Sequence, residues 1–154
     1  YLNELLTLLL PKFDPSPTLF AAYGASLAQI ADEGDTDLIL RRFELLLFDE
    51  LVYQIQWHCD YDQNPIDPAI NYVFQSDKGF VRRSTGTTDL SALTGQELLA
   101  LSSWQHSERV IDPPLRQKLK QVMRQAIEYR LGGRALRVRD AVNQWRQVGN
   151  TEEL

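Results

Sequence analysis

The chain has 154 residues, of which 44% are hydrophobic and 24% are charged, and its formal net charge is −5. This composition is typical of one globular domain with its own core, which we expect to span residues 1–154. No apolar run is long enough to cross a membrane, no signal-peptide pattern is present, and the lone Cys59 excludes an internal disulfide, so we expect a cytoplasmic protein.

Three helices are expected in the first third of the chain. Residues 1–10 form an apolar helical pattern that Pro11 stops, and because the chain starts inside this pattern we expect a fragment whose N-terminal part is absent. Ser16 can cap a second helix with Pro17 at its first position, running to about Glu33.

The third helix is expected over residues 36–56, a stretch that is apolar on nearly every side and has no Gly or Pro. A surface helix would carry a single apolar stripe, so this pattern predicts a central helix with other helices packed around it. Phe43 is expected to be buried beneath the helices near residues 1–10 and 115–130. Arg41 and Glu44 are three residues apart, share a face and can pair.

A polar loop over residues 58–68 precedes a short β-hairpin in the predicted order of elements. Tyr72-Val73-Phe74 and Phe80-Val81 have strand character, and the turn signal at residues 76–79 joins them, so we expect an insert over about residues 57–88. Thr94 and Glu97 form a capping-box pattern that opens a helix to about Ser103.

A long helix is expected from Pro113-Pro114 to Gly132-Gly133, followed by a short helix near residues 137–147. The sequence therefore predicts a mainly α fold. We expect a compact helical bundle around the central helix near residues 36–56, with a small β-hairpin insert near residues 57–85.

Charge is unevenly divided along the chain. Residues 1–112 carry 7 Lys/Arg and 17 Asp/Glu, whereas residues 113–154 carry 9 and 4, which indicates a basic face on an acidic body. Basic residues near an aromatic such as Trp145 suit phosphate contact and base stacking, with a solvated helix face as the alternative. The candidate nucleic-acid-binding residues are Lys118, Lys120, Arg124, Arg134, Arg137 and Arg139.

The polar loop contains the candidates for metal binding and catalysis. Cys59 and Asp62 have the spacing of half a zinc knuckle, but zinc needs about four ligands and no Cys or His occurs near residues 80–85, so we expect no zinc or other cofactor. Asp60, Asp62 and Asp67 could serve a metal-dependent hydrolase, with a solvated acidic loop as the alternative. Neither histidine lies in a nucleophile motif, so we do not expect an enzyme.

Several short segments, taken in order and spacing, resemble the C-terminal helical domain of the bacterial recombination mediator RecO. These segments are YLNELL at residues 1–6, LRRFEL at residues 40–45, His58-Cys59, Tyr72 with DKGF at residues 77–80, and LGGR at residues 131–134 with Leu136 and Arg139.

The resemblance implies a non-enzymatic DNA repair protein with an N-terminal OB-fold ahead of this domain. It implies binding to single- and double-stranded DNA, strand annealing, and help in loading RecA. The implied protein partners are RecR and the acidic C-terminal tail of the single-stranded DNA-binding protein SSB. Many members hold a four-cysteine zinc knuckle in the insert, and this chain keeps only Cys59, which makes the insert a degenerate knuckle.

By resemblance, the SSB tail is a short acidic peptide that ends in Pro-Phe with a free carboxylate. Its capture needs an apolar pocket and a cation, and an arginine fork suits a carboxylate. Arg41 and Leu40 are the first candidates, while Arg42 points about 100° away around the helix. The alternative is that Arg41 only pairs with Glu44. A further alternative for the whole chain is an acidic helical protein–protein adaptor without a nucleic-acid role.

Overall fold

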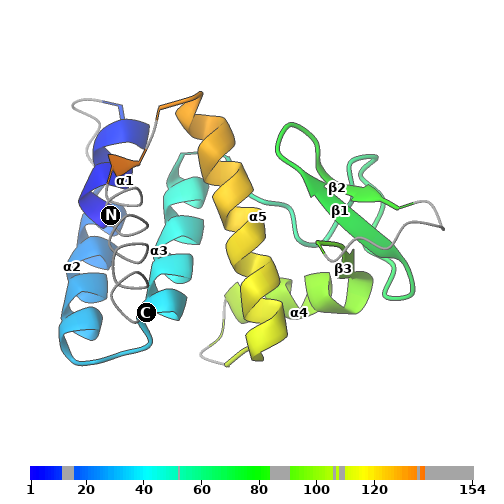
Figure 1. Cartoon of the computed structure of the whole chain (residues 1–154), viewed down its shortest axis with the longest axis horizontal. Helices are drawn as coiled ribbons and strands as arrows, with labels where there is room; N and C mark the ends of the chain where they lie inside the picture. Colours follow the sequence, from blue (N-terminus) through cyan, green and yellow to red (C-terminus); the bar gives the residue numbers. More distant parts are fainter. Residues whose placement is uncertain are drawn as a thin grey trace, which may run out of the picture.

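The N-terminal helices and a small sheet lie on opposite sides of one long helix, α5 (Pro113–Leu131), in the computed structural model (Figure 1). The structure describes residues 1–11, 16–51, 53–83, 91–105, 107, 110–134 and 136–137. Within these ranges the elements are α1 (Leu2–Leu9), α2 (Pro17–Ala31), α3 (Thr36–Glu50), β1 (Asn71–Gln75), β2 (Gly79–Arg82), β3 (Leu93–Thr94), α4 (Gly95–Gln105) and α5 (Pro113–Leu131).

Side-chain caps begin the helices where the sequence predicts them. Ser16 accepts a hydrogen bond from the Leu19 amide at 3.3 Å at the start of α2. The capping box before α4 is confirmed, because the Thr94 amide donates to Glu97 Oε2 at 2.8 Å and the Glu97 amide donates to Thr94 Oγ1 at 3.1 Å. These caps satisfy amides that have no partner within the first helical turn.

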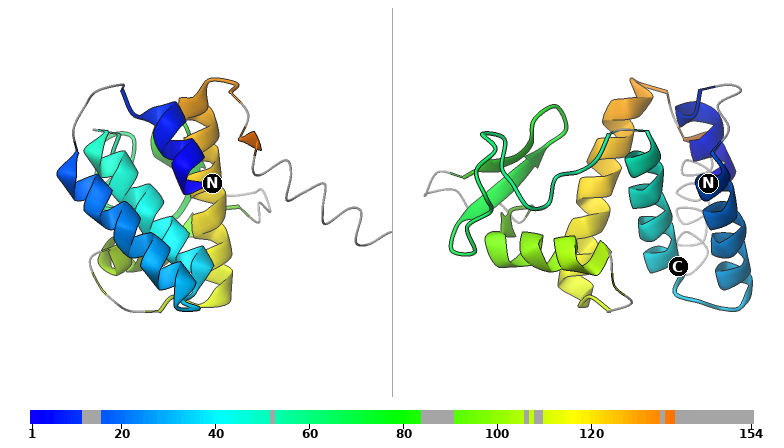
Figure 2. Two further views of the ribbon diagram at one scale, coloured as in Figure 1. Left: turned by 90° about the vertical axis from the view of Figure 1, so that its left-hand side faces the viewer. Right: turned by 180° about the vertical axis from the view of Figure 1, so that it is seen from behind.

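The central position predicted for α3 is confirmed, since α3 packs against both α2 and α5 (Figures 1 and 2). Phe43 is 2% exposed, and its ring meets the Tyr23 ring of α2 edge-on with 6.3 Å between the centroids. The apolar character on nearly all sides of this helix therefore reflects neighbours on more than one side.

The end predicted for this helix is wrong, because α3 stops at Glu50 and not near residue 56. The Tyr53 amide donates to the Phe48 carbonyl at 2.9 Å, and the chain beyond it leaves the helix. Residues 53–57, YQIQW, alternate apolar and polar side chains, which is the two-residue period of extended chain. This alternation buries Trp57, which is 3% exposed and packs on Phe80.

The predicted β-hairpin is confirmed, and a third strand extends it. The strand order is β2-β1-β3, and all pairs are antiparallel. Gln75 pairs with Gly79, so three residues form the turn, and Gly79 has a φ of 83° that glycine adopts without a Cβ clash. The third strand is only two residues long, and such a short segment carries no readable period.

The long helix α5 joins the two sides of the molecule. Its buried residues are Leu115, Leu119, Val122, Met123, Ala126, Ile127 and Leu131. It ends at Gly132, which is in a left-handed conformation, at the double glycine where the sequence predicts its end. The helix expected near residues 137–147 lies outside the described residues, apart from Arg137. Among the described helices, none combines the length and apolar character needed to cross a membrane.

Candidate functional site

Three of the candidate nucleic-acid-binding residues are already paired with carboxylates along α5. Lys118 Nζ lies 2.7 Å from Glu97 Oε1, Lys120 Nζ lies 3.2 Å from Asp37 Oδ1, and Arg124 Nε lies 2.8 Å from Glu128 Oε1. Exposed ion pairs add only about 0–1 kcal/mol to stability. Their main effect is therefore on charge, because each carboxylate offsets the positive charge that a phosphate would meet.

The C-terminal end of α5 keeps basic side chains beside α1. Arg134 and Arg137 line a groove together with residues of α1, and the Arg137 amide donates to Glu4 Oε1 at 2.6 Å. Arg134 Nε donates to the Leu131 carbonyl at 3.2 Å. Within the described part of the chain, neither guanidinium forms an ion pair, and Arg139 lies outside that part. This end of α5 therefore offers two cations for an external anion.

Arg41 on α3 is buried against Glu44. The two residues are 4% and 0% exposed, and Arg41 Nη2 lies 2.6 Å from Glu44 Oε1, which also accepts a hydrogen bond from the Tyr1 hydroxyl. The pairing that their spacing indicates is confirmed. A peptide carboxylate would need a free guanidinium beside an apolar pocket. The structure does not show this arrangement at Arg41. A peptide would reach this side chain only after its covering residues moved.

Arg42 lies on a more open face of α3. Its guanidinium carbon is 4.8 Å from the centroid of the Trp104 ring, and Nη2 donates to the Ser107 carbonyl at 2.7 Å. Leu40, which precedes Arg42 by two residues, is partly buried against the core. Arg42 is half-buried and held in a defined position, so it is the arginine of this pair that a ligand can reach.

Asp60 in the polar loop has a structural role. Its carboxylate accepts hydrogen bonds from Arg82 Nε at 2.7 Å and from the Asn64 amide at 2.9 Å, and the residue is 3% exposed. Burial raises the pKa of the Asp60 carboxyl, but the hydrogen bonds from Arg82 and Asn64 outweigh it and hold this pKa below its ordinary value. Asp60 therefore ties the loop to β2 as a carboxylate.

The three loop carboxylates are not brought together. Asp62 is exposed, and Asp67 Oδ1 accepts a hydrogen bond from the Ala69 amide at 2.9 Å in a local turn. Among the residues that the structure describes, no group of three or more His, Cys, Asp or Glu side chains is placed to hold a metal ion. The cluster that a metal-dependent hydrolase would use is therefore absent from this loop.

The surroundings of Cys59 do not fit a zinc knuckle. It is 8% exposed, and its Sγ donates to Gln56 Oε1 at 2.9 Å. Burial and the neighbouring Asp60 charge raise the pKa of the Cys59 thiol, whereas zinc binds the thiolate. One protonated sulfur among amide groups is a poor donor set for zinc, and the absence of zinc stays a prediction.

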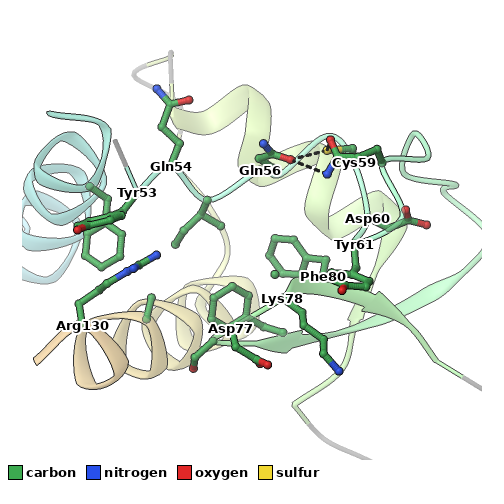
Figure 3. A pocket seen from close by; sticks show the side chains of 17 residues that line it. Tyr53, Gln54, Gln56, Cys59, Asp60, Tyr61, Asp77, Lys78, Phe80 and Arg130 are labelled. Atoms are coloured by element: carbon green, nitrogen blue, oxygen red, sulfur yellow. Dashed lines mark hydrogen bonds between the residues drawn. The ribbon is translucent and has the colours of Figure 1, made fainter. Parts of the chain in front are cut away.

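A pocket that the sequence analysis did not identify lies between residues 53–63, the β1–β2 hairpin and α5 (Figure 3). Its volume is ≈ 320 Å³, and Ile55, Phe74 and Phe80 are among its apolar lining residues. The Arg130 guanidinium lies 3.8 Å from the centroid of the Tyr53 ring, and Lys78 Nζ lies 5.8 Å from that of Tyr61. We call this feature the tyrosine–cation pocket.

A signal for this pocket was present in the sequence. The two-residue period of residues 53–57 places Tyr53 on an extended segment, where its ring can cover a side chain of α5. The contact with Arg130 joins residues that are far apart in the sequence and has no local pattern, so it could not be predicted from the sequence.

Comparison with known proteins gives one consistent result. The family described as "Recombination protein O C terminal" matches residues 1–140. The chain is 38% identical over 149 residues to the DNA repair protein RecO of Aromatoleum aromaticum, covering 96% of this chain and 60% of that protein. It is 36% identical over 142 residues to the DNA repair protein RecO of Dechloromonas aromatica, covering 90% and 57%.

The same similarity extends to a relative from a third genus. The DNA repair protein RecO of Methylococcus capsulatus is 36% identical over 141 residues, which cover 91% of this chain and 55% of that protein. The chain thus spans somewhat more than half the length of these curated relatives, and what it matches is their C-terminal part.

Proposed function

The chain belongs to the family of recombination protein O C-terminal domains, and we propose that it works as the C-terminal part of a recombinational DNA repair mediator. The family match over residues 1–140 carries this proposal. Relatives named as DNA repair proteins support a role in repair and recombination. The proposed work is binding and not catalysis, and it takes place in the cytoplasm.

The proposed DNA contact lies at the end of α5. Arg134 and Arg137 lie beside α1 without carboxylate partners among the described residues, so they can meet phosphates from their guanidinium groups. Arg139 belongs to the same proposal by its place in the sequence. Contacts of this kind lack sequence preference and weaken as salt rises.

The proposed protein partners are the acidic tail of SSB and RecR, and through them the chain would help to load RecA and anneal strands. For the tail, Arg42 is the better-placed cation on α3, because it is half-buried whereas Arg41 is covered and paired with Glu44. No metal ion is needed for this function, and the single cysteine supports that view.

Binding of a fluorescently labelled oligothymidine, followed by anisotropy across a range of salt, tests the DNA contact. The double variant Arg134→Ala/Arg137→Ala should bind the single strand more weakly, with a flatter dependence on salt, because fewer counterions are released. Arg116→Ala is the matched control, since Arg116 is on the same helix and is paired with Asp35 at 2.7 Å. Equal binding by the double variant and the control would contradict the proposed contact.

Titration calorimetry with an acidic peptide ending in Pro-Phe tests the partner contact. A peptide with a free carboxylate should bind, and its C-terminally amidated form should bind about tenfold more weakly or worse, because a charge-assisted hydrogen bond adds about 1.5–3 kcal/mol. Arg42→Ala should reduce the difference between the two peptides. If both peptides bind Arg42→Ala and the parent alike, the tail is captured elsewhere.

A further inference from the structure

We infer that the tyrosine–cation pocket is a base-stacking site for single-stranded nucleic acid, which gives the chain a preference for single strands over duplex. The inference rests on the proposed function in one respect only, which is that the chain binds DNA. It places a second contact on the sheet side of α5, in addition to the phosphate contact proposed at Arg134 and Arg137.

The pocket combines aromatic surface with available positive charge. Tyr53 and Tyr61 are 44% and 52% exposed, so both rings present aromatic surface to solvent at the pocket. Arg130 reaches from α5 beneath Tyr53 with its guanidinium end toward the middle of the pocket (Figure 3). A base can stack on an aromatic ring or on the plane of an arginine guanidinium, and the Tyr53–Arg130 stack offers both kinds of surface.

The two cations of the pocket differ from the four cations on the rest of α5. Arg116, Lys118, Lys120 and Arg124 of α5 each pair with a carboxylate. Within the described ranges, neither Arg130 nor Lys78 does so, and each instead lies over a tyrosine ring. They stand on opposite sides of the apolar lining, so a strand crossing the pocket would meet a cation at each side (Figure 3).

The lining favours a neutral base over an acidic peptide as the occupant. The exposed carboxylate of Asp77 is part of the lining, and it would repel the side chains of an acidic peptide. A base carries no charge, and the phosphates that flank it in the strand can meet Arg130 and Lys78. The amide of the exposed Gln54 can donate to or accept from a base edge.

A duplex cannot use the pocket in the same way. Its bases are stacked and paired inside the helix, so only its phosphates would reach Arg130 and Lys78, and the tyrosines would gain nothing. Removing an aromatic ring that stacks a base weakens binding of the strand by roughly tenfold. The pocket therefore predicts a selectivity for single strands that depends on bases and not on phosphates.

Anisotropy measurements with three probes test this inference: an oligothymidine, an abasic oligonucleotide of the same length, and a duplex of that length, all at one salt concentration. Tyr53→Leu should weaken the oligothymidine about tenfold and leave the abasic strand and the duplex unchanged, because only the stacked base is lost. Tyr53→Phe, which keeps the ring, should bind like the parent. Arg134→Ala/Arg137→Ala should instead weaken all three probes.

Photocrosslinking gives a second readout that does not depend on affinity. An oligothymidine with 5-iodouracil in place of thymine should crosslink to Tyr53 or Tyr61, as identified by peptide mass spectrometry. If the parent binds the oligothymidine but Tyr53→Leu binds it equally well and the crosslinks map elsewhere, the pocket is not a base site. If no probe binds the parent, both this inference and the proposed function are wrong. If the parent binds an acidic peptide and Tyr53→Leu abolishes that binding, the occupant of the pocket is a peptide.

Discussion

At the scale of single residues, Phe43 shows what burial on α3 contributes. It is 2% exposed and packs between α2 and the rest of the core. Phe43→Ala should lower the free energy of unfolding by about 3–5 kcal/mol, through lost transfer free energy and the cavity left behind. Urea denaturation followed by circular dichroism measures this. Phe20 is 79% exposed, so Phe20→Ala should change the value by less than about 0.5 kcal/mol. Equal losses for the two variants would place Phe43 outside the core.

Asp60 gives a prediction about pH. The pKa of its carboxyl is lower in the folded protein than in the unfolded chain, so the unfolded chain binds the proton more readily. The stability that Asp60 contributes is therefore complete above the unfolded pKa of about 4 and is lost as the pH falls through the lower folded value.

Asp60→Asn tests that sign. The variant should be less stable than the parent at neutral pH, because the Arg82 and Asn64 donors lose their carboxylate. The gap between the two urea midpoints should narrow as the pH is lowered below about 4. Asp62→Asn, at an exposed residue of the same loop, should show no such gap. A gap for Asp60→Asn that widens in acid would mean that its carboxyl has a raised pKa.

At the scale of elements, two glycines have opposite roles. A Cβ on Gly95 at the start of α4 would lie 1.9 Å from the Asp67 carbonyl oxygen, and the Gly95 amide donates to Ile70. Gly24 lies in the middle of α2 with open space around it. Gly95→Ala should therefore destabilise by at least about 1–3 kcal/mol through overpacking, whereas Gly24→Ala should stabilise by about 0.5–1 kcal/mol. Thermal unfolding of both variants measures this, and a stable Gly95→Ala protein would show that the 67–70 segment can move away.

The elements also show how much of the fold local sequence rules can predict. Caps, the β-turn and the glycine end of α5 involve residues close in sequence, so the Ser16 cap and the Thr94–Glu97 capping box were predictable. The predicted end of α3 is too late in the sequence, because the apolar residues at positions 53 and 55 extend the apolar run of the helix although residues 53–57 alternate. Two-residue β3 has no period of its own, and its position depends on pairing with β1.

The candidate sites were less predictable, since their properties depend on distant partners. The sequence identifies the basic residues of α5. The ion pairs of Lys120 with Asp37 and of Lys118 with Glu97, however, arise only when the helices pack. The burial of Arg41 likewise follows from the elements that cover α3 and not from its neighbours in sequence. Composition thus identified the cations, and packing decides which of them are available.

At the scale of the whole molecule, this division of cations gives a final prediction. On the proposed function, a chain of net charge −5 would bind DNA through local positive charge, and the salt dependence of that binding would count the phosphates that this charge neutralises. For single strands each contact adds about 0.7 to the slope of log affinity against log salt. Lys118, Lys120 and Arg124 already have carboxylate partners, whereas Arg134 and Arg137 form no ion pair within the described residues.

The triple variant Lys118→Ala/Lys120→Ala/Arg124→Ala should therefore keep the salt slope of the parent for oligothymidine. Its affinity should fall only modestly, through the more negative overall charge. Arg134→Ala/Arg137→Ala removes fewer charges but should flatten the slope by about 1.4, because two phosphate contacts are lost. Anisotropy titrations at several salt concentrations give both slopes, with circular dichroism as the check on folding. A flatter slope for the triple variant than for the double variant would mean that the ion pairs of α5 open when DNA binds and that the middle of the helix is the principal phosphate contact.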